Sequence, residues 1–358
     1  MVPPVAPVRS LLVEQAHVAA LFGRRNRFPP GVAGAARHPA IRQSPCSCEN
    51  AAIVDLLDKK LAFVTGKGGV GKTTVAYALG LRAAASGRRT IVCEIASQER
   101  GSRIFGKSSV GFNEVRMSED LWAISIDPEE AIREYLEVQL PVRTMAGLLR
   151  RSRLFNYLAA ATPGLTEMVT MGKVWELALD RRKSQDATRT YDLVIVDAPA
   201  TGHGVGLLQT PRNFAELARV GPLASQAARI EATIDDQDET GVLIVAGPEE
   251  MAVNESAALE RALVEGDRFA VDAIFANAVY PQRFEDAEVE RLEGALAAAG
   301  PAAAAIESAL SESRRAAAQR AQLERLGEMT EAPVTELPYV FAPELGPAEL
   351  ELLARAMA

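Results

Sequence analysis

The most constraining feature of this 358-residue sequence is the segment GKGGVGKT at 66–73, which fits the pattern G-x-x-x-x-G-K-[ST]. It follows an apolar run at 61–66 that predicts a strand, and it leads into 72–86, which predicts a helix ending at Gly87. This strand–loop–helix context predicts a loop whose backbone N–H groups bind phosphate oxygens. A glycine-rich turn that binds nothing is the alternative, and the agreement between the motif and its flanking elements disfavours it.

Each residue type in this loop has an expected role. Glycines let backbone amides approach a phosphate closely, and the helix N-terminus adds a partial positive charge. Lys72 is expected to reach the β- and γ-phosphates, and the Thr73 hydroxyl is expected to coordinate Mg²⁺. The sequence therefore predicts ATP and Mg²⁺ as ligands. The predicted nucleotide-binding residues of the loop are Gly66, Gly68, Gly69, Val70, Gly71, Lys72, Thr73 and Thr74.

Strands and helices alternate along most of the chain, which predicts an α/β fold: a mostly parallel sheet with helices on both faces. Residues 56–358 are expected to form this nucleotide-binding domain, with a helical subdomain inserted at about 128–186 and extended by 205–235. A long alanine-rich helix is predicted at 302–327. The predicted strands are 61–66, 89–95, 121–127, 191–198, 241–247, 270–278 and 334–338.

Composition narrows the function classes. The net charge of −8 argues against a general nucleic-acid binder. Three cysteines are too few for a disulfide framework and fit a reducing compartment, so a cytoplasmic location is expected. No apolar run reaches the roughly 18 residues that a membrane span requires. The sequence thus favours a cytoplasmic protein that does not bind nucleic acid.

The first 55 residues differ from the rest. Residues 1–50 contain six Arg, no Lys and seven Pro. We expect a disordered extension, or a start site placed too far upstream; an organelle transit peptide is the alternative. Cys46 and Cys48 form a C-x-C pair here, but the chain offers no second ligand pair to complete a metal site.

Lys67 is the second lysine of the loop, and a phosphate loop normally needs only one. The full run KGGVGKTT resembles the "deviant" Walker A motif of the family that holds MinD, ParA, the nitrogenase iron protein and the ArsA-type ATPases. The resemblance implies that Lys67 reaches across a dimer to the nucleotide of the other subunit. It also implies catalytic roles for Lys72 and Asp197. A solvated surface lysine is the alternative, which the match throughout the motif disfavours.

A second motif narrows the resemblance. The predicted strand 191–198 carries Asp197 at its end, where a carboxylate can hold Mg²⁺. The run DAPATGH that starts there is similar to the switch II loop of ArsA-type ATPases, which read close to DTAPTGH. The resemblance covers about residue 56 to the end of the chain and implies a loop that senses the γ-phosphate. The switch residues that it implies are Pro199, Thr201, Gly202 and His203.

Two further positions are similar to the family's adenine site. Asn277 ends the predicted strand 270–278, and the resemblance implies a hydrogen bond from it to adenine. A strand-end cap or turn residue is an equally strong interpretation from the residues alone. Pro338 begins a segment that resembles the family's cover over the adenine.

One expected residue is absent. The family's switch I usually reads DPA, and its Asp positions the attacking water, but the stretch after 89–95 contains no aspartate. Glu94 lies near the strand end, and Gln98 and Glu99 lie beyond it. A glutamine can orient water in some phosphohydrolases, so Glu94 and Gln98 are candidate switch residues. Hydrolysis is therefore less firmly predicted than ATP binding.

Several relatives within this broad family are excluded or disfavoured. Cys93 is the sole cysteine beyond the first 55 residues, so the cluster of the iron protein, the interfacial zinc of targeting ATPases and the thiol site of an arsenite pump cannot be built. The closing helix lacks the basic face that a MinD-type membrane anchor needs. Met145, Met168 and Met171 could line a client groove, but plain core packing is the preferred interpretation.

Two hypotheses for function follow from the resemblance. The first is a dimeric ATPase of the bacterial single-domain ArsA-like kind, which couples hydrolysis to a protein client or a membrane-transport partner. The second is a weakly hydrolytic regulatory or scaffold subunit that pairs with a paralogous chain. Both imply a dimer, either of two identical chains or of two paralogues.

Overall fold

A computed structural model of the protein describes residues 55–95, 99–139, 164–180, 190–218, 222–265 and 269–357. The predicted N-terminal extension, apart from its last residue, therefore lies outside the described residues, as do Gln98 and Met145. The described residues divide into two compact units. The larger comprises 55–279 and 320–357, and the smaller comprises 280–319.

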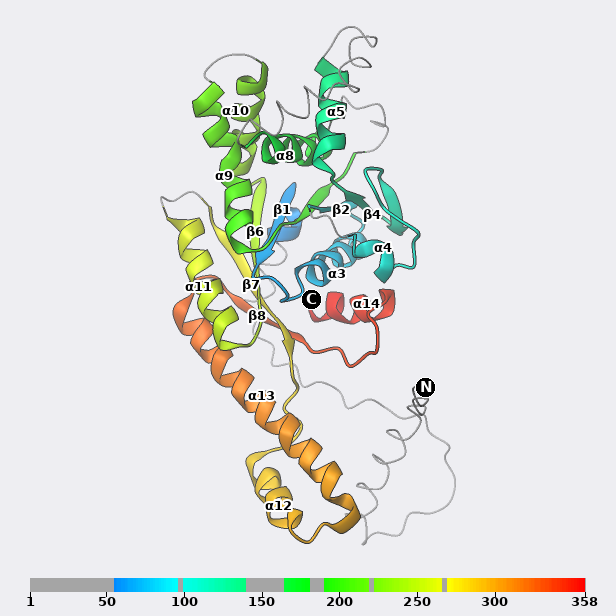
Figure 1. The fold of residues 1–358 in the computed structure, drawn as a ribbon, viewed down its shortest axis with the longest axis vertical. Coiled ribbons are helices and arrows are strands. Elements are labelled where there is room, and N and C mark those ends of the chain that lie inside the picture. The colour runs from blue at the N-terminus through cyan, green and yellow to red at the C-terminus, as the bar shows by residue number, and fades with distance from the viewer. Residues whose placement is uncertain are drawn as a thin grey trace, which may run out of the picture. The chain divides into compact units, whose positions relative to one another are not determined.

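The larger unit is built on one eight-stranded sheet with the order β3-β4-β2-β5-β1-β6-β7-β8 (Figure 1). Every strand pair is parallel except β3–β4, so the predicted α/β fold with a mostly parallel sheet is confirmed. The strands are β1 (Leu61–Gly66), β2 (Thr90–Glu94), β3 (Val115–Ser118), β4 (Leu121–Ser125), β5 (Leu193–Asp197), β6 (Thr240–Ala246), β7 (Val271–Val279) and β8 (Val334–Pro338).

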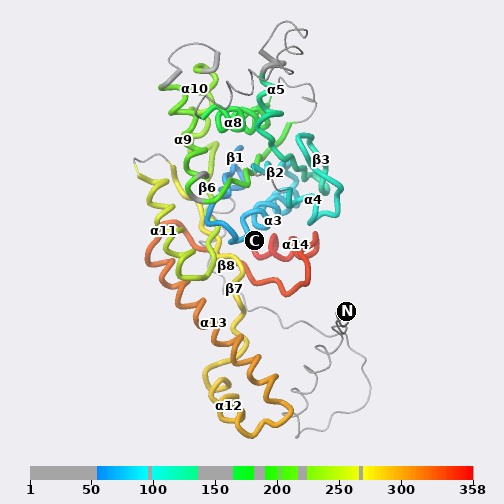
Figure 2. The backbone as a smooth tube through the Cα atoms, in the orientation of Figure 1, coloured from blue at the N-terminus to red at the C-terminus, as the bar shows by residue number. Residues whose placement is uncertain are grey.

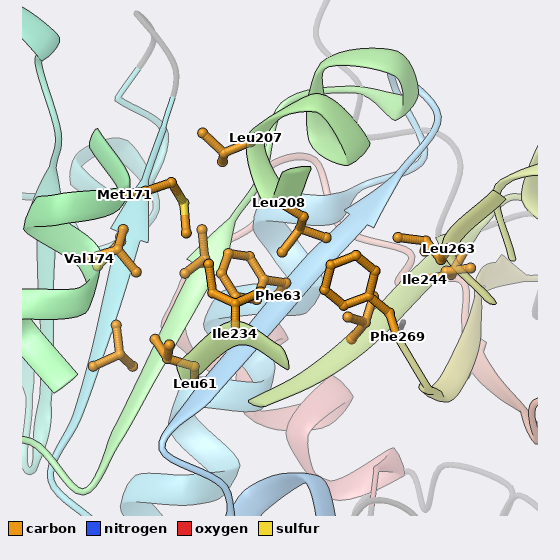
Figure 3. Close-up of a cluster of buried hydrophobic side chains, with 14 of the residues drawn as sticks. Leu61, Phe63, Met171, Val174, Leu207, Leu208, Ile234, Ile244, Leu263 and Phe269 are labelled. Carbon is orange, nitrogen blue, oxygen red and sulfur yellow. The ribbon is translucent and has the colours of Figure 1, made fainter. Parts of the chain in front are cut away.

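Helices cover both faces of the sheet. The strand period of two sends alternate side chains of β1 into two separate cores: Leu61 and Phe63 into one, Ala62 and Val64 into the other. The helices of the first core are α5 (Pro128–Gln139), α8 (Leu165–Ala178), α9 (Thr201–Ala218), α10 (Pro222–Asp235), α11 (Glu250–Val264) and the end of α13 (Ala303–Met329), and those of the second include α3 (Lys72–Ala85) and α14 (Pro347–Ala356). Figure 3 shows part of the first core, where Leu207 and Leu208 of α9 lie above Phe63.

The described part of the predicted helical insertion consists of α5, α8, α9 and α10. Met168 and Met171 of α8 are 2% and 0% exposed and belong to the first core. Packing against the sheet fixes these side chains, so they do not line an open groove, and the core-packing interpretation is confirmed for both. The long apolar methionines fill space between α8 and the sheet, as Figure 3 shows for Met171.

Two short elements were not expected. β3 has four residues, its side chains are mostly only partly buried, and its pairing with β4 shifts register between Arg116 and Ser118. So short and irregular a strand has no clear alternation in the sequence. The helix α4 (Gly101–Ile104) is a single turn, too short to show helical periodicity.

The smaller unit contains α12 (Asp286–Leu296), a 3-10 turn (Gly300–Ala302) and the first part of α13 (Ala303–Met329). No residue of α12 is buried. An ion pair between Arg314 and Glu293 joins the two helices, and Arg283, which precedes α12, pairs with Glu312 of α13. Exposed pairs of this kind contribute little stability each.

Candidate functional site

The glycine-rich loop connects β1 to α3 at the carboxyl end of the sheet (Figure 2). Strand register brings the candidate residues to it. Val64 of β1 lies opposite Asp197 of β5, and Asp197 lies opposite Glu94 of β2. Ligands of open parallel sheets bind at the carboxyl ends of the strands, so these residues occupy the edge where a ligand is expected.

Glycine is required at two places in the loop for contact reasons. Gly66 has φ +143°, and a Cβ there would lie 2.2 Å from the backbone oxygen of Val245 in β6. Gly71 has φ +93°, and a Cβ there would lie 2.3 Å from Nδ2 of Asn277. Both backbone conformations are ones that other residues rarely adopt. The loop therefore packs closely against both β6 and β7, and this packing fixes its backbone path.

Lys72 bends back over the loop that precedes it. Its Nζ donates hydrogen bonds to the backbone oxygens of Gly66, at 3.1 Å, and Lys67, at 3.0 Å. Burial lowers the pKa of Lys72, the nearby Asp197 opposes that effect, and the charge of Arg100 adds to the lowering. A partly desolvated ammonium held over a ring of backbone groups is well placed to bind an anion.

Thr73 and Asp197 form the centre of the site. The Thr73 hydroxyl donates to Oδ2 of Asp197 at 2.5 Å. Oδ1 of Asp197 is buried and makes no hydrogen bond among the described residues. A buried oxygen without a partner is costly unless a ligand completes it. A hydroxyl and a carboxylate are the oxygen ligands that Mg²⁺ prefers, so this pair fits the predicted Mg²⁺ site.

Burial raises the pKa of Asp197 to about 6, and the charge of Glu94 adds to this rise. The hydrogen bond from Thr73 and the charges of Lys72 and Arg100 act in the opposite direction. The pKa of Asp197 thus lies well above its ordinary range, although two cations and a hydroxyl are near the carboxylate. A divalent cation would restore the ionised form.

Asparagine at position 197 is expected to stabilise the Mg²⁺-free protein at pH 8. The folded-state pKa of about 6 exceeds the ordinary 3.8, so ionising Asp197 destabilises the fold. This cost is absent below about pH 4, grows up to about pH 6 and is constant above it, where it approaches about 3 kcal/mol. Urea unfolding should give Asp197→Asn a larger gain over the wild type at pH 8 than at pH 5. An equal difference at both pH values would contradict the assignment.

Asn277 holds the loop from the β7 side. Its Nδ2 donates to the backbone oxygen of Val70 at 2.8 Å. Asn277 lies inside β7, which continues to Val279, so the interpretation as a strand-end cap is wrong. The adenine contact stays a prediction. Pro338 ends β8, and the next residue, Tyr339, packs edge-on against Phe341 with ring centroids 4.8 Å apart.

The switch II segment lies beside the loop. A Cβ on Gly68 would be 3.8 Å from the Cβ of Ala200, and a Cβ on Gly204 would be 2.7 Å from Oγ1 of Thr65. The predicted loop Asp197–His203 is shorter than expected, because α9 already begins at Thr201. Thr201, Gly202 and His203 therefore form the first turn of that helix, Pro199 lies in the short connection, and the side chains of Thr201 and His203 lie outside the described residues.

Glu94 is engaged inside the fold. It is 1% exposed, and its carboxylate accepts hydrogen bonds from the Tyr77 hydroxyl at 2.6 Å and from the backbone N–H groups of Arg100 at 2.8 Å and Gly101 at 2.9 Å. Glu99 is also occupied, since it accepts from backbone N–H groups at Val110 and Gly111. Hydrogen bonding to these backbone groups lowers the pKa of Glu99, while burial opposes the effect. The switch role of Glu94 stays a prediction, and its contacts hold the backbone at Arg100 and Gly101.

Arg100 is a site residue that the sequence did not single out. Its charge lowers the pKa of both Lys72 and Asp197. Arg100 follows β2, whereas Lys72 follows β1 and Asp197 ends β5. The only signal in the sequence was one basic residue in an otherwise unassigned segment, which is most often a solvated surface residue.

Comparisons with known proteins find similarity to ATPases. A family model described as "Anion-transporting ATPase" matches residues 59–221. The ATPase BagA of Mycobacterium tuberculosis is 26% identical over 237 residues, which are 65% of this chain and 68% of that protein. The ATPase GET3 of Podospora anserina is 28% identical over 179 residues, 49% of this chain and 50% of that protein. The ATPase get3 of Schizosaccharomyces japonicus is 29% identical over 209 residues, 54% and 59% of the two chains.

Each of these matches concerns an ATPase, and the family match contains the glycine-rich loop, Asp197 and the start of α9. Within the part of the chain that the structure describes, none of the helices has the length and apolar character needed to cross a membrane.

Proposed function

We propose that this chain is an ATPase of the ArsA family, which the match to the family model and the similarity to named ATPases support, and that it binds Mg-ATP in the loop at 66–73 and couples the nucleotide to dimer assembly. The observation that carries the proposal is the Thr73–Asp197 pair, with one buried carboxylate oxygen left for a cation. We place the protein in the cytoplasm, with a protein client or membrane partner, on the resemblance and its low cysteine content.

Each residue then has a defined task. Lys72 would hold the β- and γ-phosphates, and the backbone N–H groups of Gly68–Gly71 would surround them. Thr73 and Asp197 would hold Mg²⁺, which supplies charge neutralisation on the phosphate oxygens. The first turn of α9 would report whether the γ-phosphate is present, since its start lies beside Gly68.

A second candidate function is favoured by one specific contact set. Both oxygens of Glu94 accept hydrogen bonds from the fold, so this carboxylate is a poor candidate for orienting water. A chain that binds ATP but hydrolyses it slowly fits that arrangement, and it would act as a regulatory subunit beside a paralogous chain.

The deciding experiment measures ATP binding and turnover by the isolated chain, with and without Mg²⁺. Turnover that requires Mg²⁺ supports the ATPase. Binding without turnover, followed by turnover when a paralogue is added, supports the regulatory subunit. A chain that binds neither ATP nor ADP contradicts both.

Lys67→Ala is expected to abolish ATP-dependent dimer assembly while changing ATP affinity less than about threefold. The Lys67 Nζ contacts Oε1 of Glu255 on α11 at 2.7 Å, and both side chains are partly exposed. We propose that this pair holds Lys67 within its own chain until the dimer forms. Sedimentation velocity with a non-hydrolysable ATP analogue measures the assembly.

Glu255→Gln is expected to have the opposite effect on ATP-dependent dimer assembly. Because partly exposed ion pairs contribute about 1 kcal/mol or less, freeing Lys67 should tighten the ATP-bound dimer by up to about fivefold. If the wild type shows no ATP-dependent assembly, or if Lys67→Ala assembles normally, the cross-dimer role of Lys67 is wrong.

A further inference from the structure

The backbone at Arg100 and Gly101 is held by contacts with Glu94. Glu94 is the last residue of β2, and it lies opposite Asp197 in the sheet register. Its carboxylate accepts hydrogen bonds from the backbone N–H groups of Arg100 and Gly101. This attachment places Arg100 beside the strand end that carries Asp197.

The attachment is tightly packed. The Tyr77 hydroxyl of α3 donates to the same Glu94 carboxylate at 2.6 Å. Burial raises the pKa of Tyr77, and Glu94 adds to this effect, so the phenol stays a donor. A Cβ on Gly101 would lie 1.9 Å from the Tyr77 hydroxyl oxygen and 2.7 Å from Oε1 of Glu94. No larger residue fits there, so the backbone that carries Arg100 is fixed against α3.

The guanidinium of Arg100 is exposed, and no ion pair to it is found within the described ranges. Arg88 and Arg133 of this unit, by contrast, pair with nearby acids. The charge of Arg100 instead acts on Lys72 and Asp197. An unpaired cation beside the phosphate loop lacks a structural partner, and a guanidinium binds phosphate oxygens in a planar, two-pronged geometry.

We propose that Arg100 contacts the terminal phosphate of the bound nucleoside triphosphate, and that Glu94, Tyr77 and Gly101 are the positioning residues that hold it there. The terminal phosphate is the group expected beside the strand ends of β2 and β5, because Lys72 and the Mg²⁺ pair hold the same end of the triphosphate. This inference rests on the proposed ATP site and adds a second cation, supplied by the same chain. It gives Arg100 a phosphate-binding role on the side of the site where the family's switch I aspartate is missing.

The test compares Arg100→Ala with Arg103→Ala, which removes an exposed arginine from α4, the single-turn helix that follows Arg100. Calorimetry measures the Kd for a non-hydrolysable ATP analogue and for ADP, both with Mg²⁺. Arg100→Ala should weaken the analogue about tenfold or more and ADP less than about threefold, since a charge-assisted hydrogen bond to the γ-phosphate is lost. Arg103→Ala should leave both affinities unchanged.

Two variants separate this role from simple loss of structure. The Glu94 contact uses the backbone N–H of Arg100, so Arg100→Ala leaves that contact intact. Arg100→Lys, which keeps the positive charge, should recover part of the preference for the analogue over ADP. Tyr77→Phe removes one donor from Glu94 and should lower the same preference. The double variant Tyr77→Phe/Arg100→Ala should lose little beyond Arg100→Ala alone, because both changes act through one guanidinium.

The outcomes are distinguishable. If the wild type binds ATP but Arg100→Ala matches Arg103→Ala, or weakens the analogue and ADP equally, the terminal-phosphate contact is wrong and the ATP site stands. If the wild type binds neither nucleotide, the ATP site fails and this inference fails with it. Fully additive losses in the double variant would remove Tyr77 from the positioning role.

Discussion

Alanine at Lys72 is expected to weaken ATP binding by about 100-fold and to abolish any turnover. The ammonium lies over the loop backbone, hydrogen-bonded to Gly66 and Lys67, and would exchange these carbonyls for phosphate oxygens. Losing charge-assisted hydrogen bonds to phosphate costs about 2–3 kcal/mol, which corresponds to that fold-change. Calorimetry with an ATP analogue measures the affinity, and phosphate release measures the turnover.

The matched control is Lys107→Ala, which removes an exposed lysine from the segment after α4 and should leave ATP affinity unchanged. The Lys72 variant should also remain folded, because burial already disfavours the charged ammonium in the native state. A folded Lys72→Ala protein that binds ATP like the wild type would show that the nucleotide is held elsewhere.

Gly66→Ala is expected to lower the free energy of unfolding by about 3 kcal/mol or more. The new Cβ would meet the backbone oxygen of Val245 at 2.2 Å, and this oxygen cannot rotate away as a side chain could. The positive φ of +143° adds backbone strain. Because Gly66 pairs directly with Val245 in the sheet, relief requires separating β1 from β6. Urea unfolding measures the loss.

Gly69→Ala is the control for the strain component alone. Gly69 has a similarly unfavourable φ of +89°, but a Cβ there meets nothing within 4 Å. Its cost should therefore be about 1–2 kcal/mol. If the two variants are equally destabilised, the close packing of the loop against β6 does not limit this position.

The sequence predicted those features that depend on local pattern. β1 and β8 begin and end at the predicted residues, and the phosphate loop joins β1 to α3 as expected. Buried parallel strands read as continuous apolar runs, and helices show their period over many residues. The loop motif adds turn chemistry that depends on glycine, which is visible from residue type alone.

Features that depend on tertiary contact were missed. The hydrogen bonds from the segment at 100–101 to Glu94 join residues that share no periodicity, so no pattern marks Arg100 as part of the site. The contact of Asn277 with Val70 spans 207 positions, and a resemblance to known motifs suggested a different partner for that amide. The start of α9 at Thr201 was hidden because Thr201-Gly202-His203 carries weak helix formers.

Because Gly204 of α9 lies close to Thr65, a small tilt of α9 about this contact would move the far end of the helix by a larger distance. The contact is near the first end of an 18-residue helix, which spans about 27 Å at the usual rise per residue. A tilt of about 5° about that point would shift the far end by about 2 Å, toward or away from the helices packed there. A displacement too small to break the phosphate loop would thus be amplified at α8 and α10, which pack against α9.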